Sequence, residues 1–142
     1  MDDVVIVGGG IIGAATAYFL SKEGRKVKVI ERDPTYKSAS FPLSLGGFRR
    51  QFYQKENILL GKFARDFIYQ IPELLKTEKN PNPTASMVPN GYLLMFGKDD
   101  AEEQYRALEN HKECDAGTKN IKGSELSKIF PYINNEGIET AT

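Results

Sequence analysis

Three glycines near the N-terminus have the spacing of a dinucleotide-binding turn. Gly8, Gly10 and Gly13 form a G-x-G-x-x-G motif directly after an apolar run. In such a motif Gly8 allows a tight turn, Gly10 lets a pyrophosphate approach the backbone, and Gly13 lets a helix pack closely on a strand. The N–H groups at the start of that helix, including those of Ile11 and Ile12, are free to face the phosphates together with the positive end of the helix dipole. The chemistry predicted here is binding of a diphosphate.

An acidic residue completes this pattern. Glu31 follows the second apolar run of the chain. At the end of a second strand its carboxylate can accept hydrogen bonds from an adenosine ribose, and a carboxylate there disfavours a 2′-phosphate. FAD or NAD is therefore favoured over NADP, and the motif alone does not separate FAD from NAD.

The elements that would position these residues form a βαβ unit. Residues 4–7 are a continuous β-branched run, typical of a parallel strand buried on both faces. Residues 11–23 are helix formers, Gly24 supplies a helix stop, and residues 27–30 form a short strand. A right-handed crossover makes the two strands parallel neighbours. The predicted fold class is α/β, with a Rossmann-like unit as a partial doubly wound layer.

A loop and a long helix follow the βαβ unit. Residues 38–47 are rich in Ser and Gly and predict an ordered loop. A helix is expected from about Glu56 to Pro72, where proline kinks or ends it. Residues 77–90 contain several prolines and form the best candidate for a domain crossing. The apolar face of the helix is predicted from Leu60, Phe63, Phe67 and Ile71.

The C-terminal part predicts one strand and two helices. Residues 91–97 are expected to form a strand bounded by glycines. Asp99 is the expected N-cap of the next helix, and a short helix should run from Ser124 to just before Pro131. The apolar stripe of the longer helix is predicted from Ala101, Tyr105 and Leu108. Residues 1–77 would be the N-terminal part of a dinucleotide-binding domain, and residues 78–142 the start of a second, substrate-binding region.

Composition excludes several classes of function. The 142 residues contain 19 basic and 19 acidic side chains, so no net charge favours nucleic acid or an anionic membrane surface. No apolar stretch approaches the roughly 20 residues of a membrane span. Cys114 is the only cysteine and lies between two acidic residues, and His111 lies on a helix rich in Glu and Lys. We expect an inert thiol, a solvated histidine and no metal site.

The stretch after Glu31 carries a resemblance to a known family. Glu31-Arg32-Asp33, Ser38-Ala39-Ser40 and the run LSLGGFRRQF at residues 43–52 are the residues concerned. The chain resembles the D-amino-acid oxidase and sarcosine oxidase superfamily of FAD-dependent oxidoreductases. It is most similar to the branch of FAD-dependent oxidoreductase domain-containing proteins, whose animal members are mitochondrial and linked to assembly of respiratory complex I.

The resemblance implies roles for further residues. FAD would be the cofactor, with the glycines at its pyrophosphate, Glu31 at the ribose and Arg32 beside the adenosine. Ser40 and Ser44 would border the pyrophosphate and ribityl chain. Gly46 and Gly47 would let the backbone approach the flavin ring.

The resemblance also implies an activity. Arg49 or Arg50 would reach the flavin or substrate side, and the residues do not choose between them. The family oxidises a C–N bond of an amine or amino acid by passing a hydride to the flavin. Members are about three times longer than this chain, which would then be an N-terminal fragment that is inactive by itself. A mitochondrial location is implied, although the N-terminus leaves no room for a targeting segment; otherwise the protein would be cytoplasmic.

Two other functions stay open. Phe41-Pro42 stands where relatives carry small residues, and this favours a scaffold that binds complex I assembly intermediates with weak or no catalysis. An NAD-dependent dehydrogenase is the remaining alternative.

Overall fold

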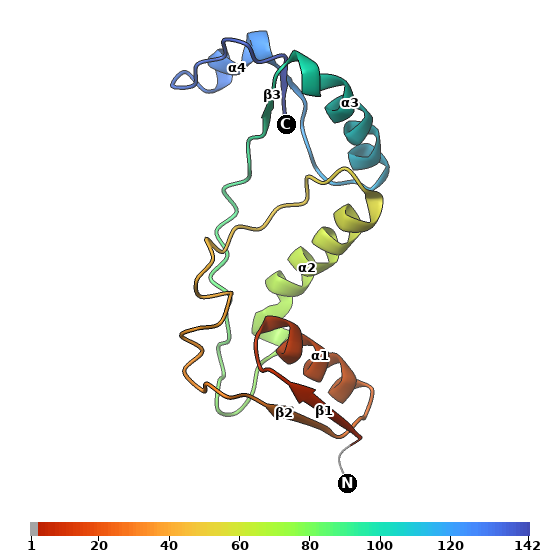
Figure 1. Ribbon diagram of the computed structural model, residues 1–142, viewed down its shortest axis with the longest axis vertical. Coiled ribbons are helices and arrows are strands. Elements are labelled where there is room, and N and C mark those ends of the chain that lie inside the picture. The colour runs from red at the N-terminus through yellow and green to blue at the C-terminus, as the bar shows by residue number, and fades with distance from the viewer. Residues whose placement is uncertain (1–2) are drawn as a thin grey trace. The chain divides into compact units, whose positions relative to one another are not determined.

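The chain is divided into two compact units. The computed structural model describes residues 3–142, so Met1 and Asp2 lie outside the described residues. The units are Met1–Gly47 and Phe48–Thr142, the first a βαβ unit and the second a mixed unit of helices and short strands (Figure 1). The boundary predicted after residue 77 concerns the two domains of a longer parent protein, and it stays a prediction.

The first unit has the predicted strand, helix and strand. They are β1 (Val4–Val7), α1 (Ile11–Lys22) and β2 (Val27–Ile30). The two strands pair in parallel over their full length, as the crossover rule predicts. Gly24 has a φ of 77°, a left-handed conformation that suits glycine and ends the helix.

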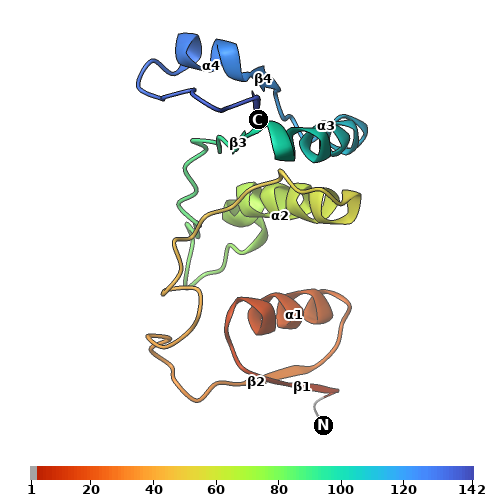
Figure 2. The same ribbon diagram turned by 45° about the horizontal axis from the view of Figure 1, so that its top comes forward.

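Only one face of this small sheet is covered. α1 lies along one side of β1 and β2 (Figure 2), and the Ile6 side chain faces α1 at Gly13. On the opposite face Val7 is 86% exposed, and Val5 and Ile30 are also exposed. The expectation that the first strand is buried on both faces is wrong for the described residues, because a single helix can cover only one face of a sheet.

The long helix of the second unit has nearly the predicted bounds. α2 spans Lys55–Leu74. Pro72 lies inside its last turn, where the missing N–H removes one helical hydrogen bond. The helix therefore ends within a turn of this proline, as predicted.

The predicted apolar face of α2 is confirmed only at Phe67 and Ile71, which are half-buried. Its buried residues are Ile58 and Gly61, whereas Leu60 and Phe63 are exposed. A Cβ on Gly61 would lie 3.3 Å from the Arg49 carbonyl oxygen. The helix packs through its smallest residue because the preceding backbone comes too close for a large side chain.

The strands of the second unit form a small antiparallel sheet. β3 (Met95–Phe96), β4 (Ile121–Lys122) and β5 (Thr140–Ala141) are arranged in the order β3-β5-β4. The strand predicted at residues 91–97 is reduced to β3, and the backbone groups of Leu94 and Thr142 extend its pairing by two hydrogen bonds of 2.9 Å.

The two remaining helices are α3 (Lys98–Glu113) and α4 (Gly123–Ile129). The N-cap of α3 is Gly97, so the prediction of Asp99 as cap is wrong; Asp99 lies in the first turn, where the helix dipole favours a carboxylate. Of the predicted stripe of α3, Ala101 is buried and Leu108 is half-buried as expected, whereas Tyr105 is 43% exposed, because small and polar residues fill most of the inward face. It consists of Ala101, Gln104, Ala107 and His111.

The core of the second unit lies where α2 meets the end of α3. It contains Ile58, Cys114 and Ala116, with the Phe52 ring packed against them. Cys114 is therefore a buried free thiol. Among residues 3–142, no helix has the length and hydropathy that crossing a membrane requires.

Candidate functional site

The glycine turn joins β1 to α1. Gly8 has a φ of 100°, a conformation that side chains rarely adopt, and its N–H donates to the Ile30 carbonyl at 2.8 Å. A Cβ on Gly13 would lie 1.9 Å from the Gly8 carbonyl oxygen. These positions have the geometry expected from the motif, in which one glycine makes the turn and another permits close packing.

The start of α1 is open and its amides are unpaired. Within residues 3–142, no backbone or side-chain acceptor bonds the N–H groups of Ile11, Ile12 and Gly13, and the first helical bond runs from Ala14 N–H to Gly10. A Cβ placed on Gly10 would meet nothing within 4 Å. This end of the helix therefore offers donors and free space to an anion.

Glu31 lies directly against this turn. Its Oε2 accepts the Gly9 N–H at 2.7 Å, and its Oε1 accepts the Asp33 N–H at 2.9 Å. Both hydrogen bonds lower the pKa of Glu31 below its ordinary value, and the bond from Asp33 has the larger effect. A carboxylate has about four lone-pair positions, so the ionised side chain can still accept a hydroxyl.

Gly9 and Tyr36 belong to the same site, although sequence reasoning did not select them. A Cβ on Gly9 would lie 2.7 Å from the Tyr36 hydroxyl and 3.4 Å from the Glu31 Cβ. Tyr36 has a φ of 55°, an unusual conformation for a tyrosine. The unbroken run of three glycines was a signal for Gly9, whereas no local pattern marks Tyr36.

The loop residues predicted from the resemblance are exposed. Ser44 donates its hydroxyl hydrogen to the Phe41 carbonyl at 2.8 Å and accepts the Gly46 N–H at 3.1 Å, so it shapes a local turn. None of the hydrogen bonds found in the described part of the chain joins this turn to the glycine turn. The other exposed residues of this group are Arg32, Ser40 and Gly47.

The structure separates the two candidate arginines, which both lie in the second unit. The Arg49 guanidinium lies over the Phe52 ring, 5.1 Å from its centroid, and Arg49 lines a pocket of about 360 Å³. A nitrogen of the Arg50 guanidinium lies 3.3 Å from the position of a Cβ on Gly117, and its Cγ faces Gly61. Arg49 is thus available to a ligand, whereas Arg50 packs between α2 and the loop after α3.

The pocket combines an apolar wall with a few polar groups. Its polar side chains besides Arg49 are Gln51, Gln104 and His111. The expectation of a solvated His111 is wrong: it is only 4% exposed, because it lies on the inward stripe of α3. Its spacing from Gln104 and Ala107 was the signal that sequence reasoning missed. The apolar wall consists of Phe52, Tyr53, Leu93, Leu94, Met95 and Phe96.

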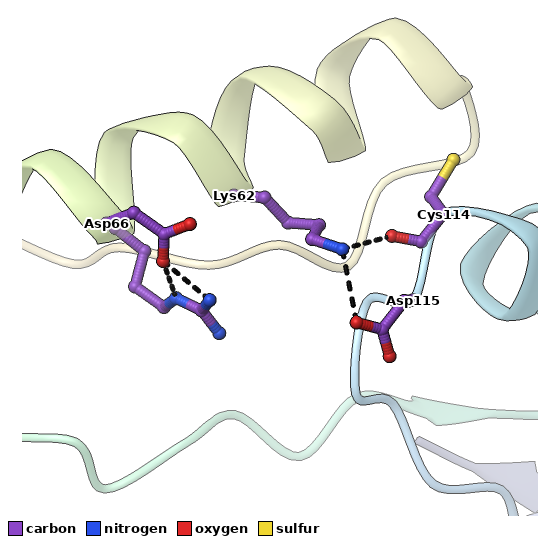
Figure 3. A network of polar contacts seen from close by, with 5 residues as sticks. Lys62, Asp66, Cys114 and Asp115 are labelled. Atoms are coloured by element: carbon purple, nitrogen blue, oxygen red, sulfur yellow. Dashed lines mark hydrogen bonds and ion pairs between the residues drawn. The ribbon is translucent and has the colours of Figure 1, made fainter.

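A lysine ties α2 to the end of α3 close to this core. Lys62 donates to the Cys114 carbonyl at 2.6 Å and to the Asp115 carboxylate at 3.3 Å (Figure 3). These contacts hold the two helices together without reaching the pocket. Within residues 3–142, no group of His, Cys, Asp and Glu side chains has the arrangement of a metal site.

Comparison with known proteins identifies the family. Residues 3–141 match the family model described as FAD dependent oxidoreductase, DAO. The chain belongs to this DAO family. Among curated members, FAD-dependent oxidoreductase domain-containing protein 1 from Xenopus laevis is 40% identical over 99% of this chain and 29% of its own length. The Bos taurus protein of that name is 37% identical over 99% of this chain and 30% of its own length.

A solved structure of similar fold is the L-proline dehydrogenase from P. horikoshii. It superposes with a TM-score of 0.76 at 25% identity, over 99% of this chain and 35% of that one. The DAO chain described here thus spans about a third or less of the proteins that it matches. The predicted α/β fold with a Rossmann-like unit is confirmed.

The residues present fit the cofactor of a DAO family member. FAD has a pyrophosphate that needs donors and an adenosine ribose that needs an acceptor. The unpaired amides of Ile11 to Gly13 supply the donors, the Cβ-free Gly10 leaves space, and Glu31 supplies the acceptor. FAD is therefore the cofactor, and the NAD-dependent alternative is set aside.

Proposed function

We propose that the protein carrying this chain oxidises a C–N bond of a small amine or amino acid. The carrying observation is the open, unpaired start of α1 with the Glu31 carboxylate beside it. The L-proline dehydrogenase of similar fold supports the choice of substrate class, since its named substrate is an amino acid. When bound, FAD supplies a hydride acceptor at the flavin ring.

The residues of this chain would bind the cofactor and orient the substrate. The amides at the start of α1 would hold the pyrophosphate, and the ionised Glu31 would accept hydrogen bonds from the ribose hydroxyls. Arg49 is the best candidate to attract an anionic group of the substrate, because its guanidinium lines a pocket with an apolar wall. That wall would reduce the contact of a bound substrate with water and so strengthen the attraction between the charges.

The test is reduction of the bound flavin by substrate in the absence of oxygen. The purified protein is reconstituted with FAD and mixed with a panel of amino acids and secondary amines. We expect loss of the visible flavin absorbance with at least one of them, with formation of the corresponding imine or its hydrolysis product. If FAD binds and no amine or amino acid in the panel reduces it, the proposal is wrong.

A matched pair of variants tests the role of Arg49. Arg49→Lys removes the planar, two-pronged donor, and we expect the apparent KM to rise about tenfold or more. Arg106→Lys makes the same chemical change on the exposed side of α3, where Arg106 pairs with Glu102. It should leave KM within about twofold of the unmodified protein, since a surface pair contributes little.

A second proposal is a partner-binding role in assembly of mitochondrial respiratory complex I. Phe41, 59% exposed beside Pro42, offers an apolar contact. Bound FAD without turnover, together with co-purification of complex I subunits that Phe41→Ser abolishes, would favour this role over the enzyme.

A further inference from the structure

Two neighbouring side chains of α3 bind two neighbouring carbonyls of the segment that carries Arg49. Asn110 donates its Nδ2 hydrogen to the Tyr53 carbonyl at 2.8 Å. His111 Nε2 lies 2.8 Å from the Phe52 carbonyl oxygen. All four residues belong to the unit Phe48–Thr142. The last turn of α3 therefore holds this segment at two consecutive points.

The chemistry of the acceptor determines the form of His111. A carbonyl oxygen only accepts hydrogen bonds, so the Nε2 atom must carry the hydrogen. In the neutral ring Nδ1 is then a bare acceptor, and within residues 3–142 this buried atom has no partner. An unpaired buried acceptor costs about 1–3 kcal/mol. The fold tolerates this cost because the Nε2 hydrogen of the same ring bonds the Phe52 carbonyl.

The contact with Phe52 reaches Arg49 through the aromatic ring. The Phe52 ring packs on Ile58, Cys114 and Ala116 and carries the Arg49 guanidinium above it. Among the described residues Arg49 forms no ion pair, so the ring is its identified electrostatic partner. A shift of the Phe52 backbone would therefore move the ring and the guanidinium together.

We propose that His111 is a positioning residue for Arg49. Its Nε2 hydrogen fixes the Phe52 carbonyl, and Phe52 keeps the guanidinium beside the pocket, ready for an anionic group. The use of Arg49 in catalysis rests on the proposed function, but the chain of contacts does not. The role is distinct from ligand binding, because the polar contact of His111 is made to backbone.

The first test reads the hydrogen position directly. His111 is the single histidine of the chain, so its ring signals need no assignment. Long-range proton–nitrogen correlation spectra of the purified protein should show hydrogen on Nε2 and a bare Nδ1 in the neutral ring. A neutral ring with hydrogen on Nδ1 would overturn the proposal, since Nε2 could then not donate to Phe52.

The second test compares three variants by the Arg49 side-chain signal. In the unmodified protein the Phe52 ring current should displace the Arg49 Nε–H resonance, which Arg49→Lys identifies. His111→Leu should abolish that displacement, whereas His111→Gln should retain it because the glutamine amide can place a donor near the Nε2 position. Arg106→Met is the matched control: it removes an exposed ion pair with Glu102 within α3.

Each outcome of this comparison either supports or overturns the positioning role of His111. An Arg49 signal that does not move in His111→Leu, or moves equally in Arg106→Met, would overturn the proposal. If His111→Leu does not fold, a displaced Arg49 signal in His111→Gln would support the proposal and its loss would contradict it. In the FAD-loaded protein, His111→Leu should raise KM about tenfold with a smaller change in kcat, and His111→Gln should restore it. The resonance measurements do not depend on whether an amine reduces the flavin. Failure of the proposed function can therefore be distinguished from failure of the His111 proposal.

Discussion

Gly10 shows how one residue can serve a ligand and not the fold. It is the N-cap of α1 with extended backbone, a φ of −62° and a ψ of −176°, and it has open space around its Cα. Serine is a better N-cap than glycine, because its hydroxyl accepts a first-turn N–H. Gly10→Ser would therefore use the donors that the pyrophosphate needs.

For Gly10→Ser we expect opposite effects on stability and on binding. The ligand-free protein should be as stable as the unmodified one or more stable by about 0.5 kcal/mol. The Kd for FAD should rise about tenfold or more, equal to about 1.4 kcal/mol. Chemical denaturation and fluorescence titration with FAD measure the two quantities. Gly13→Ala is the comparison: its Cβ would clash with the Gly8 carbonyl, so it should lower stability by about 1–3 kcal/mol.

Glu31 links the glycine turn to pH. Its pKa is lowered by the hydrogen bonds from the Asp33 and Gly9 amides. A carboxyl whose folded pKa is lowered stabilises the fold above its unfolded pKa, and this contribution is lost as pH falls through the folded pKa. Glu31→Gln should therefore reduce stability most at neutral pH, with the difference shrinking on acidification. Thermal melts across the acid range measure it, and a difference that is the same at neutral and acid pH would contradict the assignment.

At the scale of elements, the sequence predicts the helices better than their faces. The spacing of apolar residues placed Leu60, Phe63 and Tyr105 on inward faces, but these three side chains are exposed. Both helices pack through small residues, Gly61 on α2 and Ala101 and Ala107 on α3. Small residues allow close approach of backbones, and which stripe uses that property depends on the partner, which periodicity does not specify.

Gly123 is the clearest case of such a close approach. It begins α4, and a Cβ there would lie 1.8 Å from the Ile138 carbonyl oxygen. Gly123→Ala should destabilise the antiparallel sheet by about 1–3 kcal/mol. The new Cβ would clash with backbone atoms, which cannot move aside as the flexible end of a side chain can. Gly97→Ala is the matched control: its Cβ would meet the Gly137 carbonyl oxygen at 3.6 Å, an ordinary contact, and its effect should be smaller. Equal losses in urea denaturation would contradict this account.

At the scale of the whole molecule, the face of β1 and β2 opposite α1 is an exposed apolar surface. Val5, Val7 and Ile30 are exposed there, whereas Ile6 faces α1. An exposed apolar patch on a strand pair promotes self-association. In the described residues, the sheet of this α/β fold therefore has a helix on only one of its two faces.

A pair of identical changes on the two faces tests this description. Val7→Thr should leave the free energy of unfolding within about 0.5 kcal/mol, because the side chain is exposed, and should reduce binding of a hydrophobic dye. Val4 lies on the face toward α1, so the hydroxyl of Val4→Thr would be partly buried. This variant should lower the free energy of unfolding by about 1 kcal/mol or more. Urea denaturation with dye fluorescence measures both. The account fails if Val7→Thr is the more destabilising change.

The sequence by itself determined the βαβ unit and the geometry of its turn. The residues responsible, from Val4 to Glu31, are close along the chain, so turn conformation, helix start and strand pairing follow from local preferences. The same closeness places the unpaired amides and the carboxylate together. FAD binding was predictable for this reason.

Only the tertiary structure decided which arginine is available and why His111 is buried. The contact between His111 and Phe52 joins residues 59 positions apart, and Arg50 reaches a loop beyond α3. Neighbouring arginines in one segment have the same local preferences, so nothing near them in sequence distinguishes their partners. Contacts at such separation depend on how the helices pack, and packing is a property of the folded unit as a whole.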